Sequence, residues 1–130
     1  MKYYALMIVI TVILISITFY LLKRKFKKKT KVTNEPKVCE IFYFYTSWCP
    51  YCKKAFVEWN KFKAEWNYKT LDGYKLQFQE VDCDINEALA VKYNVTTYPT
   101  IKLVKDDMVI DYDAKPTLDS LTRFITSSFD

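Results

Sequence analysis

The chain has 130 residues, of which 51% are hydrophobic, so one folded domain with a sizeable core is expected. It carries a formal net charge of +5, four cysteines and no histidine. The absence of histidine excludes Ser-His-Asp and Cys-His catalysis and every zinc site that needs a histidine ligand. Cysteine chemistry therefore comes first among the remaining reactions.

Residues 3–22 form an apolar segment without a charged side chain. About 20 apolar residues allow a helix to cross a hydrocarbon layer of ~30 Å. Tyr3, Tyr4 and Tyr20 lie near its ends, where aromatic rings favour the membrane–water boundary. The segment is longer than the roughly 7–15-residue core of a signal peptide and lacks a clear small-x-small cleavage site. We therefore expect residues 1–22 to form an uncleaved, single-pass transmembrane anchor.

Seven basic residues lie between residues 23 and 31, whereas only Lys2 precedes the apolar segment. The positive-inside rule places this flank, and the domain after it, on the cytoplasmic side of the membrane. Membrane adjacency accounts for the charge, and the remaining chain has no basic surface for nucleic acid. Residues 23–36 are predicted to be a basic linker, and no nucleic-acid partner is expected.

Residues 37–130 are predicted to form one α/β domain. Residues 38–45 are almost continuously apolar, which is typical of a central strand buried on both faces. A helix follows with Pro50 in its first position. Its apolar residues recur at three- and four-residue spacing: Ala55, Phe56, Trp59, Phe62 and Trp66. The helix ends before a turn at Asp72-Gly73, which contains the only glycine of the chain.

The second half of the domain continues the alternation of strands and helices. Residues 75–82 are predicted to be a strand, residues 85–93 a short helix, and residues 100–105 and 108–112 two strands around a turn. Thr117 is a candidate N-cap of the last helix. The order β-α-β-α-β-β-α makes the first two strands parallel, with a right-handed crossover, and the last two an antiparallel hairpin. The sequence therefore predicts a mixed four-stranded sheet.

The motif Trp48-Cys49-Pro50-Tyr51-Cys52 lies between the first strand and the first helix of the domain. Unpaired N–H groups and the helix dipole favour a thiolate at a helix N-terminus. We therefore expect Cys49 to be an exposed nucleophile. Cys52, one turn further, is expected to resolve the mixed disulfide and close a Cys49–Cys52 redox disulfide.

A Cys-x-x-Cys motif can also be half of a zinc site. The other cysteines, Cys39 and Cys83, are single and belong to opposite ends of two parallel strands. That separation disfavours four ligands at ~2.3 Å from one zinc ion, and also a Cys39–Cys83 disulfide with its Cα atoms within roughly 7 Å. Both are expected to be buried free thiols, with a regulatory role left open for Cys83. No metal and no cofactor are predicted.

Two segments resemble the thioredoxin superfamily. Residues 44–53, which contain the dithiol, resemble its active-site segment, and Val95-Thr96-Thr97-Tyr98-Pro99-Thr100-Ile101 resembles its cis-proline loop. The resemblance covers residues 38–128 and implies a compact thioredoxin-like fold and thiol–disulfide oxidoreductase activity. It also implies that Trp48 flanks the site, that Pro99 is the cis-proline, and that Tyr98 offers its backbone to an extended substrate.

Within the superfamily the motifs point in two directions. Cys-Pro-Tyr-Cys and the compact element order resemble glutaredoxins, whereas Trp48 and the segment Tyr98-Pro99-Thr100-Ile101 resemble thioredoxin and the protein disulfide isomerases. The Gly-Gly segment with which glutaredoxins hold glutathione is missing, since Gly73 is the sole glycine. A protein disulfide is therefore preferred as substrate. Two alternatives stay open: a glutathione-dependent oxidoreductase, and a non-catalytic, membrane-tethered binding module.

One departure from the family concerns proton transfer. Thioredoxins carry a buried acid six residues before the first cysteine, and this position is occupied by Tyr43. Glu80 is a candidate proton relay in its place, and the alternative is a solvated strand residue. On the cytoplasmic side we expect reduction of substrates, with an electron donor that the sequence does not identify.

Overall fold

The structure, a computed structural model, describes residues 2–26 and 36–130 and divides into two compact units, Met1–Asn34 and Glu35–Asp130. Most of the predicted basic linker lies outside the described residues. The first unit contains helix α1, Lys2–Phe26, which continues four residues beyond the predicted end of the anchor. Its segment Lys2–Leu21 has a mean hydropathy of 2.4 and is nowhere buried by the protein. By length and composition, this helix is able to cross a membrane.

The serine and threonine hydroxyl groups of α1 have partners within the helix. Thr11 donates to the carbonyl of Ile8 at 2.8 Å, and Ser16 donates to the carbonyl of Val12 at 2.9 Å. Thr18 donates to the carbonyl one turn before it at 2.8 Å. A hydrocarbon layer offers no water to hydroxyl groups, so this internal pairing lowers the cost of placing them there.

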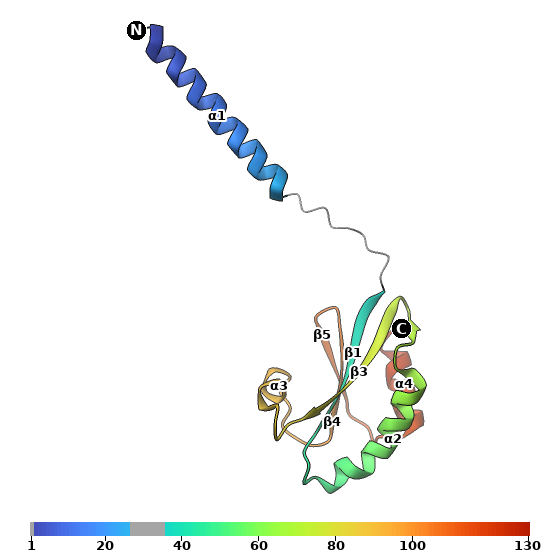
Figure 1. Cartoon of the computed structure of the whole chain (residues 1–130). Helices are drawn as coiled ribbons and strands as arrows, with labels where there is room; N and C mark the ends of the chain where they lie inside the picture. The colour runs from blue at the N-terminus through green and yellow to red at the C-terminus, as the bar shows by residue number, and fades with distance from the viewer. Residues whose placement is uncertain (1, 27–35) are drawn as a thin grey trace. The chain divides into compact units, whose positions relative to one another are not determined.

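The second unit is built on a five-stranded mixed sheet in the order β2-β3-β1-β4-β5. The central strand β1, Lys37–Tyr45, pairs in parallel with β3, Tyr74–Asp82, and antiparallel with β4, Thr100–Lys105. The edge strands are β5, Met108–Tyr112, and β2, Thr70–Leu71. Helices α2, Pro50–Trp66, and α4, Leu118–Ser127, cover one face of the sheet, and α3, Glu87–Lys92, covers the other (Figure 1).

The side chains of β1 supply both halves of the core, because successive residues of a strand point to opposite faces. Cys39, Ile41 and Tyr43 pack in one cluster with residues of α2 and α4. Phe42 and Phe44 pack in a second cluster, which includes residues of β3 and α3. The expectation of a central strand buried on both faces is thereby confirmed.

The fold is thioredoxin-like, as expected, but the predicted four strands are one too few. Asp72 and Gly73 have φ angles of 47° and 78°, which is the backbone of a tight two-residue hairpin turn. Thr70 therefore pairs with Lys75, and Leu71 with Tyr74. The turn was predicted, but two residues are too few to show a strand pattern.

Candidate active site

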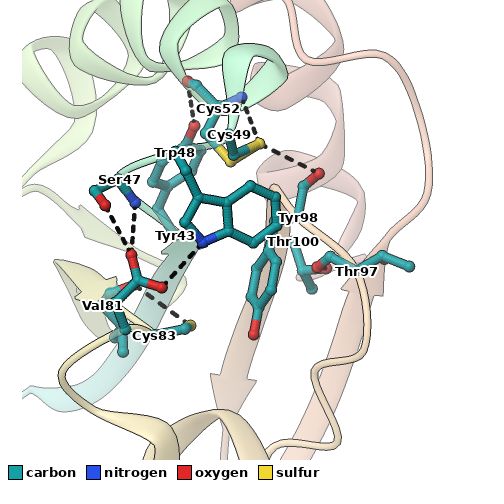
Figure 2. The surroundings of a disulfide bond; sticks show 11 residues. Tyr43, Ser47, Trp48, Cys49, Cys52, Val81, Cys83, Thr97, Tyr98 and Thr100 are labelled. Atoms are coloured by element: carbon teal, nitrogen blue, oxygen red, sulfur yellow. Dashed lines mark hydrogen bonds between the residues drawn. A yellow bond between two sulfur atoms is a disulfide. The ribbon is translucent and has the colours of Figure 1, made fainter.

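The dithiol lies where the chain leaves the carboxyl end of β1 and enters α2 (Figure 2). Cys49 is the N-cap of α2, and its Sγ accepts a hydrogen bond from the backbone N–H of Cys52 at 3.1 Å. Pro50 follows in the first helical position, where no N–H is required. The sulfur of Cys49 thus satisfies one of the free N–H groups of the helix, and this contact favours the thiolate after reduction.

Cys49 and Cys52 form a disulfide, with their Cα atoms 5.3 Å apart. Both residues are 3% exposed, so the expectation that Cys49 is exposed is wrong for this oxidised form. The bond turns Sγ of Cys49 toward Cys52, and the carbonyl oxygen of Tyr98 lies 3.7 Å from it. The sequence pattern predicts that Cys49 lies at the start of a helix, but it does not show that the Tyr98 backbone lies against it.

The loop before β4 meets the dithiol. The Tyr98-Pro99 peptide bond is cis, as the resemblance implied. Trp48, which is 68% exposed, meets Tyr98 edge to face, with ring centroids 6.3 Å apart. The structure therefore brings Trp48, Cys49, Cys52 and Tyr98 together from two segments that are distant in the sequence (Figure 2). Pro99 follows Tyr98 directly across the cis peptide bond.

Sequence reasoning missed Asp84. Its Oδ2 accepts hydrogen bonds from the backbone N–H and the hydroxyl of Ser47, both at 2.9 Å, and its Oδ1 accepts one from the indole N–H of Trp48 at 3.1 Å. These donors, first the Ser47 backbone, hold the pKa of the Asp84 carboxyl below its ordinary value. The signal was available: Asp84 follows β3 by two residues, and the carboxyl ends of parallel strands meet at one edge of a sheet.

Tyr43 lies beneath the resolving cysteine. Its side chain is fully buried, and its hydroxyl donates to the backbone carbonyl of Cys52 at 2.7 Å. Burial, and then the charge of Glu80, raise the pKa of Tyr43 well above its ordinary value. The phenol is therefore a fixed hydrogen-bond donor at neutral pH rather than an acid.

Glu80 lies opposite Tyr43 in the parallel register of β1 and β3. Its Oε1 accepts from the indole N–H of Trp59 and from the ammonium of Lys63, both at 2.9 Å. Within the described residues its hydrogen bonds go to these two donors and not to Cys52. The rings of Tyr43 and Trp59 are stacked, with their centroids 5.1 Å apart, so these two aromatic side chains connect Glu80 with the backbone of Cys52.

A cavity of about 370 Å³ opens beside Cys52. Its walls include Tyr43, Thr46 and Lys53. The hydroxyl oxygen of Thr46 is buried and has no hydrogen-bond partner among the residues that the structure describes. A buried hydroxyl of this kind is usually satisfied by water. The cavity therefore gives solvent a route to the Cys52 side of the disulfide.

The other two cysteines are not part of the disulfide, and they lie in two different core clusters. Cys39 belongs to the cluster under α2 and α4, and Cys83 belongs to the cluster under α3. Both are free and buried. Burial raises the pKa of Cys39 to about 11 and also raises the pKa of Cys83. Both thiols are therefore less nucleophilic at neutral pH than an exposed cysteine.

Comparison with known proteins links this geometry to one family. The family model described as thioredoxin matches residues 18–127. The chain is 32% identical over 83 residues to the probable protein disulfide-isomerase A4 of Caenorhabditis elegans, and 33% identical over 81 residues to the human protein disulfide-isomerase TMX3. These matches cover 64% and 62% of this chain, but only 13% and 17% of the two relatives.

Solved structures agree with the sequence matches. The first thioredoxin domain of mouse protein disulfide-isomerase A4 has a TM-score of 0.60 and 27% identity, and the match covers 71% of this chain and 64% of that one. A malarial protein has a TM-score of 0.59 and 26% identity over 70% of this chain and 97% of its own. The fold of this chain is therefore similar to that of a mouse thioredoxin domain and to that of a malarial protein.

Proposed function

The chain belongs to the thioredoxin family, and we propose that it is a membrane-tethered enzyme that reduces disulfides of other proteins through Cys49 and Cys52. The observation that carries the proposal is the Cys49–Cys52 disulfide at the N-terminus of α2, beside the Tyr98 carbonyl. A dithiol in this position is able to open, because the helix N-terminus stabilises the thiolate that results.

The general activity rests on the family. A thioredoxin domain that is homologous to enzymes named protein disulfide-isomerase, and that holds a close cysteine pair, makes the chain a thiol–disulfide oxidoreductase. The matched segments make up only 13% and 17% of these two relatives, so the relatives' further activities and partners are not transferred to this chain.

The proposed reaction has two exchanges. In the first, the Cys49 thiolate attacks one sulfur of a substrate disulfide, forms a mixed disulfide and releases the first substrate thiolate. In the second, the Cys52 thiolate attacks Sγ of Cys49, closes the disulfide that the structure contains, and releases the second substrate thiolate. The substrate gains two electrons and the enzyme loses two. A dithiol donor then restores the reduced enzyme by the same steps in reverse.

Substrate contacts are proposed for the side chains and backbone around the dithiol. The Tyr98 carbonyl faces Cys49, so an extended substrate segment can pair with this backbone as an added strand does. Trp48 is exposed beside it and offers apolar surface, while Asp84 fixes the indole in place. Pro99 has no backbone N–H, so at this point of the loop the Tyr98 backbone is the group that is offered to the substrate.

Proton transfer to and from Cys52 is the step in which this chain departs most from the family, because Tyr43 occupies the position of the buried acid. We propose that the cavity beside Cys52 supplies the solvent that exchanges the proton. Tyr43 holds the Cys52 backbone during this step. Glu80 remains a candidate relay, which would act through Tyr43 and Trp59 rather than by contact with Cys52.

Helix α1 is proposed to anchor the enzyme in a membrane, with the thioredoxin domain on the cytoplasmic side. Its length, its apolar composition and its internally bonded serine and threonine hydroxyl groups support a membrane span. The seven basic residues after the apolar segment, against Lys2 before it, support the orientation. In a reducing compartment the dithiol would act as a reductant.

The proposal is tested with the full chain in detergent micelles. With dithiothreitol as donor, the enzyme should accelerate the reduction of insulin disulfides, and Cys49→Ser should abolish the acceleration. Cys39→Ala is the matched control, because Cys39 is a free cysteine near the start of β1, far from the carboxyl end of the strand that carries the dithiol, and it should retain the activity. Equal activity of the Cys49→Ser enzyme would refute the proposal. A glutathione mixed disulfide as the only accepted substrate would replace protein reduction with a glutathione-dependent activity.

A further inference from the structure

A groove of about 710 Å³ lies beside the dithiol, and it shares no lining residue with the cavity at Cys52. Three segments line it: the first turns of α2, the cis-proline loop and the segment before α4. Tyr98 and Pro99 form part of its wall, and the Tyr98 carbonyl is 3.7 Å from Sγ of Cys49. A substrate segment at the Tyr98 backbone would therefore place its next residues in or near this groove.

Among the described residues that line the groove, Glu58 is the only acidic one, and its carboxylate is paired with other groups. Glu58 accepts from the ammonium of Lys61 at 2.6 Å and from the backbone N–H of Leu118 at 3.0 Å. The Lys61 contact first, and then the Leu118 N–H, hold the pKa of Glu58 below its ordinary value. The carboxylate thus occupies the N-terminus of α4 and leaves little negative charge for the groove.

Two lysines line the same groove and keep their charge available. Lys54 and Lys115 are exposed, and neither forms an ion pair within the described part of the chain. They come from different elements, α2 and the segment before α4. Tyr51, which is 71% exposed, adds an aromatic wall. The groove is therefore basic and partly aromatic, and it is complementary to an acidic segment.

We propose that this groove selects protein substrates in which an acidic residue lies within a few positions of the reactive cysteine, with Lys54 and Lys115 as specificity-determining residues. The inference rests on the proposed reduction of protein disulfides and specifies its substrate class. The lysines raise the local concentration of acidic segments and align them with the Tyr98 backbone. They take no part in the exchange of the disulfide itself.

The test uses the full chain in detergent micelles and a set of peptides with one disulfide. Glu, Gln or Lys is placed in turn at each of the three positions before and after the reactive cysteine. On one side of the reactive cysteine, kcat/KM should be about three- to tenfold higher for the Glu peptide than for the Gln peptide, as expected for two exposed charge contacts. The Lys peptide should have a lower kcat/KM than the Gln peptide. The preference should decline as salt is added. The double variant Lys54→Glu, Lys115→Glu should reverse the order of the three peptides.

Two controls separate the groove from the dithiol. Lys69→Glu has the same change of charge as each groove substitution, at an exposed lysine beyond the end of α2, and should retain the preference for Glu. A small neutral disulfide, 4,4′-dithiodipyridine, should react with the reduced groove variant as fast as with the reduced native enzyme.

Equal rates for the Glu, Gln and Lys peptides at every position would overturn the groove proposal and leave protein reduction intact. No turnover of any peptide would instead overturn the proposed function. A preference that survives the double variant, or that disappears equally in Lys69→Glu, would also overturn the groove proposal.

Discussion

The hydroxyl of Tyr43 donates a hydrogen bond to the backbone carbonyl of Cys52 at 2.7 Å, from a side chain that is fully buried. A phenol therefore stands at the position where the family carries an acid, and it contacts the backbone of the second cysteine of the dithiol. Because burial keeps the phenol protonated, Tyr43 donates to the Cys52 backbone at neutral pH, and we expect it to position Cys52.

Tyr43→Phe should slow the second exchange and leave the first unchanged. The ring keeps its packing, but the loss of one buried hydrogen bond should cost about 1 kcal/mol of stability and loosen the Cys52 backbone. Rapid-mixing kinetics should show a mixed disulfide at Cys49 that lives about two- to tenfold longer, since 1.4 kcal/mol corresponds to a factor of about ten. Tyr45→Phe is the control, because Tyr45 stacks on Tyr43 without this hydrogen bond. An equal lifetime in the two variants would show that the Tyr43 hydroxyl has no role in the exchange.

Asp84→Asn should weaken the attachment of the loop that carries Trp48. The native carboxylate accepts three hydrogen bonds, and its pKa is lower in the folded state than in the unfolded chain. Its contribution to the free energy of unfolding is therefore present above the unfolded pKa of about 3.9, and is lost as the pH falls through the folded pKa. Denaturant unfolding should show a difference between native and variant enzyme at pH 7 that disappears in strong acid. A difference that is the same at both pH values would contradict the ionic role of Asp84.

Alkylation should distinguish the four cysteines after reduction. The N-terminus of α2 favours the thiolate of Cys49, whereas burial raises the pKa of Cys39 and of Cys83. Iodoacetamide at pH 7, followed by peptide mass spectrometry, should modify Cys49 first and Cys39 only after unfolding. Modification of Cys83 as fast as Cys49 would instead show that the cluster under α3 opens readily.

The orientation of the membrane anchor can be tested with a glycosylation acceptor in the chain itself. Asn94-Val95-Thr96 fits the acceptor pattern for N-glycosylation, and Asn94 is exposed. With the domain on the cytoplasmic side, the chain expressed in eukaryotic cells should carry no glycan at Asn94. A glycosidase-sensitive change in mobility that disappears in Asn94→Gln would place the domain in the lumen. Protease treatment of intact vesicles should digest the domain in the first case and spare it in the second.

The sequence predicted those parts of the fold that have a strong local pattern. Residues 100–105 and 108–112 form strands as expected. Thr117 caps α4: its hydroxyl oxygen accepts from the backbone N–H of Ser120, and its own N–H donates to the Ser120 hydroxyl. The predicted turn between the two strands is formed by Asp106 and Asp107, with φ angles of 46° and 67°. Short elements were harder: β2 has two residues, and α3 begins at Glu87 because residues 85 and 86 still bond to the Asp82 carbonyl.

In the candidate site, too, the residues in local motifs were predicted, and the contacts between distant segments were not. Cys49, Cys52, Trp48, Tyr98 and Pro99 were predicted from two motifs, and the fold brings the motifs together. The role of Asp84 depends on which strand ends meet at an edge, and the burial of Cys49 depends on the position of a distant carbonyl. Such contacts between separate segments leave little trace in a local pattern, so they emerged only from the structure.

The mixed disulfide is the most direct test of the account. Cys52→Ser should trap substrate proteins covalently at Cys49, in complexes that non-reducing electrophoresis separates and that dithiothreitol dissolves. Cys49→Ser should trap none. Complexes of equal yield at Cys52 in the Cys49→Ser enzyme, or none in either variant, would contradict the assignment of Cys49 as nucleophile and Cys52 as resolving thiol.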